Sequence, residues 1–592
     1  MRKTKIICTL GPSTDSTEIL EAMVQSGMDV ARFNFSHGTH AEHKARLDRL
    51  KEVRERLDIP VGALLDTKGP EIRLKKFETG KETLETGQTF TLTAREVVGN
   101  KEICSVTYRN LAQDVAVGTT IMLDDGLIRM TVTELTETDV ICRVENGGPI
   151  KDRKGVNVPG VHLSMPYMSA QDREDLLFGI QEGFDFVAAS FCRSAQDVME
   201  IRRLLDEHQS NMRIIAKLEN QEGVNNVDEI LAVADGIMIA RGDMGVEIDF
   251  TEIPVIQKDL ISHTLAMGKH VITATQMLDS MMTNPRPTRA EITDVANAVY
   301  DGTSAVMLSG ETAAGKYPVE AVRTMAAIAK RTEADINYFG RMKEMTADIR
   351  LGIGGATAHA ACTTAVDTNA SAIITVTTSG ATPRLISRFR PDTPIIACVM
   401  NEDIRRQLSL TWGVTPLIMG YVGSTDEMID GSVAAAKKAG LIQDGEIAVV
   451  TAGVPAGIAG TTNMMKVHLV GSSLITGAGV GTENVKGILC VCRTVSDIRS
   501  KFHPGMILVV PHTSNEMLPY LRQAAGIIAE ENGLGSHAAV VGLSLNKAVI
   551  VGAIGATRKL HDGMKVSMDC RQGTVQSLAD YEQPKSWRSA IV

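Results

Sequence analysis

The run Ile214-Ile-Ala-Lys217-Leu-Glu219 carries a cation and a carboxylate at a spacing that could serve phosphoryl transfer. Its apolar residues predict a β-strand, and side chains alternate along a strand, so Lys217 and Glu219 should point the same way. An ammonium group can stabilise a moving phosphoryl group, and a carboxylate can hold a divalent cation. The run by itself leaves open a surface ion pair at a strand end.

Further charged residues follow other apolar runs. Four basic residues would form an anion site on an otherwise acidic protein: Arg32, Lys68, Arg73 and Lys217. Glu219 and Asp243 are the best candidates to hold a metal ion, and two carboxylates leave positions open for substrate oxygens and water. That pattern favours Mg²⁺ or Mn²⁺ over zinc. The glycines of Ala240-Arg-Gly-Asp-Met-Gly245 could let backbone N–H groups cradle an anion, or could simply form a tight turn.

The elements that must position these residues are strands of one barrel. Apolar, β-branched runs alternate with helical patterns, and eight such runs predict a parallel (β/α)8 TIM barrel. The predicted strands are residues 5–10, 29–35, 61–67, 184–191, 213–219, 236–243, 270–277 and 304–311. Because the active site of such a barrel lies at the carboxyl ends of its strands, we expect the charged residues to gather there.

The rest of the chain predicts three additions to this barrel. Residues 70–167 show short strand patterns separated by Gly, Asp and Asn turns, and this inserted β domain is placed to act as a lid. A second α/β segment follows the barrel, and the Gly/Ser/Thr-rich residues 471–479 predict a linker before a final unit. The predicted domains are a barrel (1–69 and 168–340), a β lid (70–167), an α/β domain (341–471) and a C-terminal domain (472–592).

Composition excludes several classes of protein. The 592 residues carry a formal charge of −10, which argues against a nucleic-acid-binding protein. We find no signal peptide and no apolar run long enough to span a membrane, and the nine scattered cysteines fit free thiols in a reducing cytoplasm. Cys490 and Cys492 lack the further ligands of a zinc site. We therefore expect a cytoplasmic protein.

Seven long motifs occur in order along the chain: KTKIICTLGPS (3–13), VARFNFSHG (30–38), LDTKGPEIR (65–73), IIAKLENQEGV (214–224), IARGD (239–243), TATQML (273–278) and MLSGET (307–312). With these motifs the chain resembles the pyruvate kinase family from Lys3 to about Val470. So many long motifs in the same order make the resemblance highly specific. It implies an enzyme that transfers the phosphoryl group of phosphoenolpyruvate to ADP, giving pyruvate and ATP in the last step of glycolysis. The family is typically a homotetramer.

The resemblance also implies roles for residues. Lys217 would stabilise the phosphoryl group in flight, while Glu219 and Asp243 would ligate Mg²⁺ or Mn²⁺. Phosphate oxygens would be held by Arg32 and Arg73. The substrate carboxylate would be seated by Gly242, Asp243 and Thr275. Enolpyruvate would be protonated through water or a relay around Thr275, Ser309 and Glu311, and the donor itself stays open.

A second cation is implied in the same way. The residues that match the family's K⁺ pocket are Asn34, Ser36, Asp66 and the carbonyl of Thr67. Potassium-dependent members carry a glutamate before the Ile-Arg of the third-strand motif, and independent members carry a lysine there. Glu71 occupies this position. The resemblance therefore implies dependence on K⁺.

The α/β domain resembles the family's regulatory domain. The loop that would bind an effector phosphate contains Thr377, Thr378, Ser379, Gly380 and Thr382, whose hydroxyls and N–H groups suit a phosphate nest. Many members grip the second phosphate of fructose 1,6-bisphosphate with a downstream Trp and Arg. Residues 452–460 contain neither, so we favour a phosphorylated effector with one phosphate, such as AMP or a sugar monophosphate.

The last domain resembles the phosphohistidine swivelling domain of phosphoenolpyruvate-utilising enzymes. That domain has Thr-Ser-His where this chain has Gly535-Ser536-His537. His537 could be phosphorylated, but the missing Thr and the lack of an ATP-grasp-like segment favour a structural or regulatory tail.

Two other functions stay open on the sequence. A phosphoenolpyruvate-using aldolase-like or mutase-like barrel could share the metal carboxylates, and a catalytically silent regulator could share the scaffold. ADP-dependent formation of pyruvate distinguishes both from a kinase.

Overall fold

The structure, a computed structural model, describes residues 2–346, 351–420, 424–443, 446–453, 462–471, 473–481 and 484–578. The chain folds into two compact units. One comprises Met1–Val366, Ile373–Ala435 and Val450–Met465, and the other comprises Asp367–Ala372, Ala436–Val449 and Lys466–Val592. No helix in the described part of the chain is long and apolar enough to cross a membrane.

A closed barrel of eight parallel strands confirms the predicted (β/α)8 architecture, with the order β1-β17-β16-β15-β14-β13-β3-β2. The strands are β1 (Lys5–Thr9), β2 (Val30–Asn34), β3 (Gly62–Asp66), β13 (Phe186–Ala189), β14 (Arg213–Leu218), β15 (Gly236–Ala240), β16 (His270–Ala274) and β17 (Ala305–Leu308). Nearly every strand residue is buried, since helices cover the barrel outside and side chains fill it inside. Each strand lies within a predicted run, and most of the polar residues that ended those runs come at or just after the strand.

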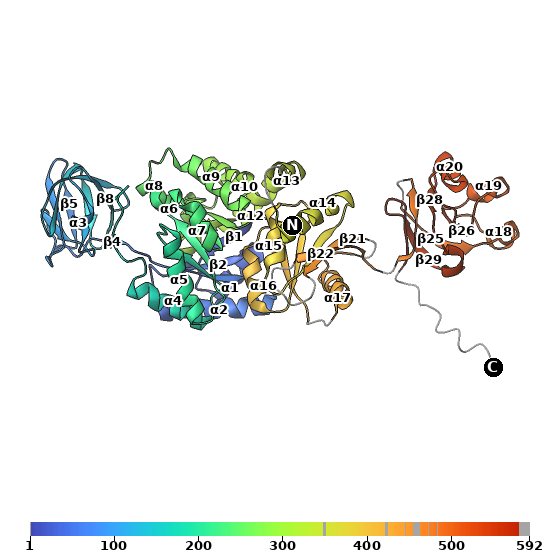
Figure 1. Ribbon diagram of the computed structural model, residues 1–592, viewed down its shortest axis with the longest axis horizontal. Helices are drawn as coiled ribbons and strands as arrows, with labels where there is room; N and C mark the ends of the chain where they lie inside the picture. Colours follow the sequence, from blue (N-terminus) through green and yellow to red (C-terminus); the bar gives the residue numbers. More distant parts are fainter. Residues whose placement is uncertain are drawn as a thin grey trace. The chain divides into compact units, whose positions relative to one another are not determined.

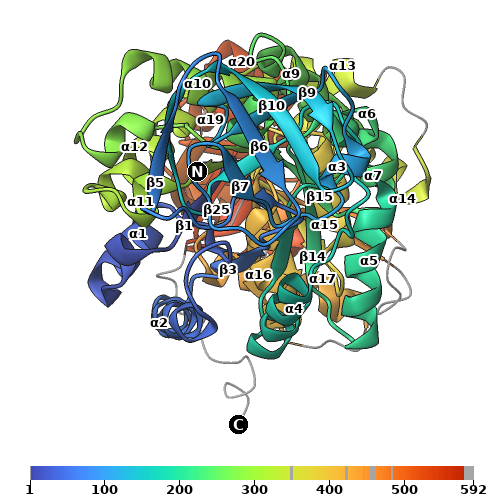
Figure 2. The same cartoon turned by 90° about the vertical axis from the view of Figure 1, so that its left-hand side faces the viewer.

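Helices surround these strands, as Figures 1 and 2 show. They include α1 (Thr17–Ser26), α2 (His40–Leu57), α4 (Ala170–Glu182), α5 (Ala195–Glu207), α7 (Val227–Val233), α9 (Ile253–Ala266), α10 (Arg289–Asp301) and α12 (Pro318–Glu333). Thr39, Ser169 and Thr288 begin their helices with capping boxes, which satisfy N–H groups that have no partner inside the helix. Three short helices follow strands at the catalytic end: α6 (Gln221–Asn225), α8 (Arg241–Glu247) and α11 (Gly310–Ala313).

The inserted β domain has its own core. Its seven-stranded sheet has the order β4-β12-β8-β9-β10-β6-β7, and β11 pairs with β5 in a second sheet. The strands are β4 (Ile72–Arg73), β5 (Lys81–Leu84), β6 (Thr89–Thr93), β7 (Ile103–Ser105), β8 (Thr120–Leu123), β9 (Ile128–Leu135), β10 (Asp139–Asn146), β11 (Gly148–Lys151) and β12 (Gly155–Asn157). Phe90, Leu92 and Met130 are fully buried in its interior. One short helix, α3 (Leu111–Asp114), interrupts the strands.

Beyond the barrel, a five-stranded sheet has the order β20-β19-β18-β21-β22. Its strands are β18 (Ala372–Val376), β19 (Ile395–Val399), β20 (Val414–Ile418), β21 (Ile447–Gly453) and β22 (Thr462–Leu469). The helices of this part are α13 (Tyr338–Thr346), α14 (Ile353–Asp367), α15 (Ala381–Arg388), α16 (Glu402–Gln407) and α17 (Thr425–Lys438).

The C-terminal part forms an eight-stranded sheet with the order β23-β30-β29-β25-β26-β27-β28-β24. Its strands are β23 (Ser473–Thr476), β24 (Ala478–Val480), β25 (Asn484–Val491), β26 (Ile507–Val510), β27 (Gly526–Ala529), β28 (Ala548–Val551), β29 (Lys565–Asp569) and β30 (Thr574–Ser577). Its helices are α18 (Val495–Lys501), α19 (Leu518–Leu521), α20 (His537–Ser544) and α21 (Ala556–Lys559). The predicted linker over 471–479 is wrong, because Ile475 is buried and pairs with Val575 in this sheet.

Candidate active site

A buried carboxylate joins two cations at the catalytic end of the barrel. Asp66 ends β3, and its side chain is 1% exposed. Nε of Arg32 donates to Asp66 Oδ2 at 2.6 Å, and Nζ of Lys217 donates to Oδ1 at 3.1 Å. Strands β2, β3 and β14 thus bring three charges together from positions far apart in the sequence.

The three charges depend on one another. Burial by itself would raise the pKa of Asp66, but the positive charges of Arg32 and Lys217 hold that pKa below its ordinary value. Burial likewise opposes the charged form of Lys217, and Asp66 and Glu219 reverse this and raise the lysine pKa. Asp66 and Glu219 thus favour the charged form of Lys217 in this site.

Lys217 and Glu219 point the same way, which confirms the prediction from strand alternation. Nζ of Lys217 lies 2.9 Å from Oε1 of Glu219, and the two residues are 8% and 1% exposed, so the pair is not a surface ion pair. Glu219 Oε2 accepts the N–H of Phe191 at 2.6 Å. Burial raises the pKa of Glu219; Lys217 opposes this shift and Asp243 adds to it.

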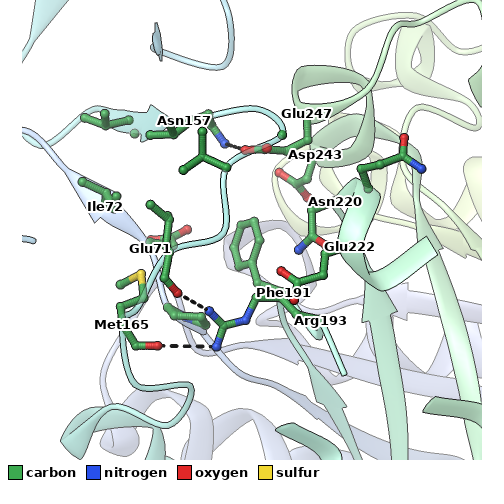
Figure 3. A pocket seen from close by; sticks show the side chains of 18 of the residues that line it. Glu71, Ile72, Asn157, Met165, Phe191, Arg193, Asn220, Glu222, Asp243 and Glu247 are labelled. Carbon is green, nitrogen blue, oxygen red and sulfur yellow. Dashed lines mark hydrogen bonds between the residues drawn. The ribbon is translucent and has the colours of Figure 1, made fainter. Parts of the chain in front are cut away.

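The donor set fits a divalent cation. Glu219 Oε1 has no partner with hydrogen-bond geometry in the described chain, although it is buried beside Lys217. Asp243, on α8, is exposed and lines a pocket together with Phe191, whose N–H binds Glu219 (Figure 3). Among the described residues no three His, Cys, Asp or Glu side chains cluster as a metal site. A cation held by two carboxylates would keep positions for substrate oxygens, which is the coordination that Mg²⁺ usually adopts.

The ends of β15, β16 and β17 carry the other predicted residues. The Gly242 N–H donates to Thr275 Oγ1 at 2.8 Å, so these two predicted residues are in contact. Glu311 is buried, and its carboxylate accepts the N–H groups of Leu278 at 3.0 Å and Ser309 at 2.7 Å. Burial raises the pKa of Glu311. The structure thus brings Thr275 to Gly242 and Ser309 to Glu311.

The residues of the predicted K⁺ pocket lie on adjacent strands. Asn34 on β2 is paired with Asp66 on β3 in the barrel register. The Ser36 N–H donates to Asn34 Oδ1 at 3.1 Å, which folds the chain after β2 back toward this point. The Thr67 carbonyl accepts a hydrogen bond from Ser190 Oγ at 2.7 Å.

Arg73 lies on β4 of the inserted domain. Its Nε donates to Glu71 at 2.7 Å and its Nη1 donates to the Arg153 carbonyl at 3.0 Å. The structure therefore pairs the two predicted residues Glu71 and Arg73 with each other. A substrate phosphate would have to share the Arg73 guanidinium with Glu71.

A pocket of about 600 Å³ connects the inserted domain with the barrel. Figure 3 shows Asn157 from β12 reaching Glu247 on α8, and Asn157 Nδ2 donates to Glu247 Oε1 at 2.8 Å. Arg193 donates to the Leu163 carbonyl at 3.0 Å on the opposite side of the pocket. The cationic groups that line the pocket include Arg73, Lys154 and Arg193.

Sequence reasoning missed one residue of this cluster. Ser190 follows β13, is 1% exposed and accepts a hydrogen bond from Lys217 Nζ at 2.8 Å. Its Oγ also donates to the Thr67 carbonyl, so it connects the lysine to the predicted K⁺ pocket. Its place directly after a buried strand was the available signal, but a serine there is also common in plain loops.

The predicted effector loop joins β18 to α15. The Gly380 N–H donates to Thr377 Oγ1 at 3.0 Å, and Gly380 has a φ of +73°, a left-handed conformation that suits glycine. Thr382 Oγ1 lies 2.6 Å from Thr462 Oγ1, and Thr378 is exposed. Within the stretch that lacks Trp and Arg, residues 454–460 lie outside the described residues.

His537 begins α20 and is hydrogen-bonded through both ring nitrogens. Nδ1 lies 2.7 Å from Thr513 Oγ1, and Nε2 lies 3.1 Å from Asn515 Oδ1. Thr513 Oγ1 also donates to Glu531 at 2.8 Å. The imidazole is therefore held in one orientation by its own domain.

A parallel (β/α)8 barrel with cations and carboxylates at its strand ends is typical of TIM-barrel enzymes that act on anionic substrates. Comparison with known sequences specifies the family: the profile of the pyruvate kinase barrel domain matches residues 1–322, and that of the pyruvate kinase α/β domain matches residues 355–468. The chain belongs to the pyruvate kinase family. The mobile domain of phosphoenolpyruvate-utilising enzymes matches residues 502–573.

Relatives that match nearly the whole chain are also pyruvate kinases. A pyruvate kinase of Geobacillus stearothermophilus is 49% identical over 577 residues, which cover 97% of this chain and 98% of the relative. A pyruvate kinase of Staphylococcus aureus strain USA300 is 47% identical, with 97% and 99% covered. The crystal structure of a pyruvate kinase from Cryptosporidium parvum matches with a TM-score of 0.76 and 40% identity over 79% of this chain and 96% of that one.

The hydrogen bond between Ser190 and Lys217 predicts that Ser190→Ala keeps the fold and loses activity. Removal of one hydrogen bond to a buried charged group should lower kcat/KM for phosphoenolpyruvate by about 10- to 100-fold. Ser194→Ala is the matched control, since the Ser194 side chain makes no capping hydrogen bond at the start of α5. Steady-state assays of both variants, with thermal unfolding as the check on folding, measure the effect. Equal activities would refute the role of Ser190.

Proposed function

We propose that this enzyme transfers the phosphoryl group of phosphoenolpyruvate to ADP and forms pyruvate and ATP, as the last step of glycolysis. The observation that carries the proposal is the buried cluster of Arg32, Asp66 and Lys217 with the carboxylate of Glu219 at its edge. A phosphoryl transition state needs positive charge and in-line positioning more than covalent chemistry. Arg32 and Lys217 would supply the positive charge, and the strands of the barrel that hold them would supply the positioning.

Two sets of cations would surround the phosphoryl group. Lys217 and Arg32 lie on strands of the barrel, and Lys217 would face the phosphoryl group during transfer. Arg73 and Lys154 belong to the inserted domain and border the pocket. ADP would enter this pocket, whose volume of about 600 Å³ lies within the range of small-molecule sites. The inserted domain would act as a lid that excludes water during transfer.

Glu219 and Asp243 would hold Mg²⁺ or Mn²⁺. Such an ion, when bound, neutralises charge on the phosphoryl and carboxylate oxygens of the substrate. The protein contributes two carboxylates of different character. Glu219 is buried and fixed by the Phe191 N–H, whereas Asp243 is exposed at the pocket wall. One ligand would thus stay in place while substrate and water exchange on the open side.

The substrate carboxylate would be seated by Thr275 and the amides of Gly242 and Asp243. In the structure the Gly242 N–H is already bonded to Thr275 Oγ1, so the carboxylate would compete for this donor. Glu311 and Ser309 would belong to a relay that protonates enolpyruvate. Burial keeps a proton on Glu311 at higher pH than on a surface glutamate, which suits such a relay.

The proposed function includes control by an effector and assembly into an oligomer. An effector with a single phosphate would bind at residues 377–382 of the α/β regulatory domain, and the enzyme would be a cytoplasmic homotetramer. We retain the four domains with the boundaries 1–69 and 168–340, 70–167, 341–471 and 472–592. His537 would have a structural or regulatory role, since both of its ring nitrogens are engaged within its domain.

Lys217→Met should retain the fold and lose phosphoryl transfer, because it removes the cation that faces the moving group. We expect kcat to fall by about 10²- to 10³-fold or more in an assay that couples pyruvate to NADH oxidation. Lys258→Met is the control, since Lys258 forms an exposed ion pair with Asp301 on the outside of the barrel. Normal turnover by Lys217→Met would overturn the proposed mechanism.

Glu71 predicts dependence on K⁺. The wild-type enzyme should lose activity in buffer free of K⁺ and Na⁺, and added KCl should restore it. Glu71→Lys should retain activity without K⁺, because an ammonium group would replace the ion. Unchanged wild-type activity in the cation-free buffer would contradict this prediction.

The effector loop predicts activation by monophosphates. AMP or a sugar monophosphate should lower the phosphoenolpyruvate concentration at half-maximal rate, and Thr378→Glu should abolish this effect through charge repulsion with the phosphate. Activation by fructose 1,6-bisphosphate at a far lower concentration than by either monophosphate would refute the preference for one phosphate.

A further inference from the structure

The segments that follow β15 and β16 are hydrogen-bonded to each other beyond the last paired residues of these strands. Their register aligns Ala240 with Ala274, so the next residues, Arg241 and Thr275, lie next to each other at the catalytic end. Both residues begin segments that carry predicted substrate ligands. The side chain of Arg241 turns toward β16 and makes a set of contacts there whose partners the sequence did not identify.

All five N–H groups of Arg241 have acceptors. Nε donates to the Ala274 carbonyl at 3.2 Å, and Nη2 donates to the Thr275 carbonyl at 2.7 Å. The remaining N–H groups reach Asp294 Oδ1 at 2.7 Å, Asp294 Oδ2 at 2.8 Å and Gln257 Oε1 at 3.3 Å. Asp294 is on α10 and Gln257 is on α9, so the guanidinium ties two surrounding helices to the end of β16.

The backbone that Arg241 holds has an unusual conformation. Thr275 has a φ of +68° and Gln276 a φ of +53°. A β-branched residue rarely adopts the left-handed region, so this turn needs support from its surroundings. The turn directs Thr275 Oγ1 to the N–H of Gly242 at 2.8 Å. Hydrogen bonds to the carbonyls on both sides of this threonine supply the support.

We propose that Arg241 is a positioning residue for the substrate carboxylate. Anchored by Asp294, it fixes the Ala274 and Thr275 carbonyls and so keeps the Thr275 hydroxyl and the Gly242 amide where the carboxylate would bind. This inference rests on the proposed function of the site. The role of Arg241 differs from that of a purely structural ion pair, because its guanidinium binds the backbone of Thr275, the residue that would contact the substrate.

Lysine cannot take over this role. An ammonium group is a point charge without the planar fork that reaches a carboxylate and two carbonyls at once. A lysine at this position would still place a positive charge near the carboxylate of Asp294, which favours the charged form. Arg241→Lys therefore tests the geometry of the contacts and not the presence of a charge.

The first experiment compares Michaelis constants. For Arg241→Lys we expect KM for phosphoenolpyruvate to rise by about 10- to 100-fold while KM for ADP changes by no more than about twofold. Asp294→Asn should shift the same constant in the same direction by a smaller factor. Arg202→Lys is the matched control, since Arg202 pairs with Asp235 near the opposite ends of the strands. Equal rises in both Michaelis constants, or a KM for phosphoenolpyruvate that stays at the wild-type value, would refute the positioning role.

The second experiment is chemical rescue. Arg241→Ala should regain activity when millimolar guanidinium is added, because the free cation can occupy the cavity between Asp294 and the two carbonyls. Arg202→Ala should not respond. A purely structural role predicts a lower unfolding temperature without rescue, and that result would also refute the proposal. Should Arg241→Ala fail to fold, the Michaelis constants of Arg241→Lys decide.

Assays of the wild-type enzyme distinguish failure of the proposed function from failure of the positioning role of Arg241. Failure of the wild-type chain to form pyruvate from phosphoenolpyruvate and ADP would refute the proposed function. Wild-type activity combined with unchanged phosphoenolpyruvate constants in Arg241→Lys would refute only the positioning role.

Discussion

The carboxylate of Asp66, shared between Arg32 and Lys217, is the interaction on which the rest of the site depends. Removing an ion from water costs several kcal/mol, and loss of one partner leaves the others buried without compensation. The three charges are therefore tolerable only together. Because they come from β2, β3 and β14, the barrel register that aligns these strands is itself a condition for an active site.

This constraint explains why one carboxylate of the site differs from the other. Asp66 contacts two cations, whereas Glu219 accepts one amide N–H at Oε2 and lies beside one lysine at Oε1. In the proposed function Oε1, which has no partner with hydrogen-bond geometry in the described chain, would bind the metal ion. Asp66 and Glu219 both lie beside Nζ of Lys217. Their surroundings nevertheless shift their pKa values in opposite directions, down for Asp66 and up for Glu219.

The inserted β domain contributes to the site from a separate core. Its strands enclose their own apolar core, and one of its contacts with the barrel, that of Asn157 with Glu247, is polar. Polar contacts can form and break without exposing a hydrophobic interior. In its proposed role as a lid, the inserted domain would break and re-form such polar contacts as it opens and closes.

The sequence by itself determined the barrel, the inserted β domain and the orientation of Lys217 and Glu219, because these follow from alternation within one strand and from motifs in a fixed order. It misjudged residues 471–479, where a Gly/Ser/Thr-rich composition concealed the buried Ile475. Only the tertiary structure decided the partners of Ser190 and Arg241. Their hydrogen bonds join residues from different strands and helices, and no local pattern records a contact that exists only once the barrel has closed.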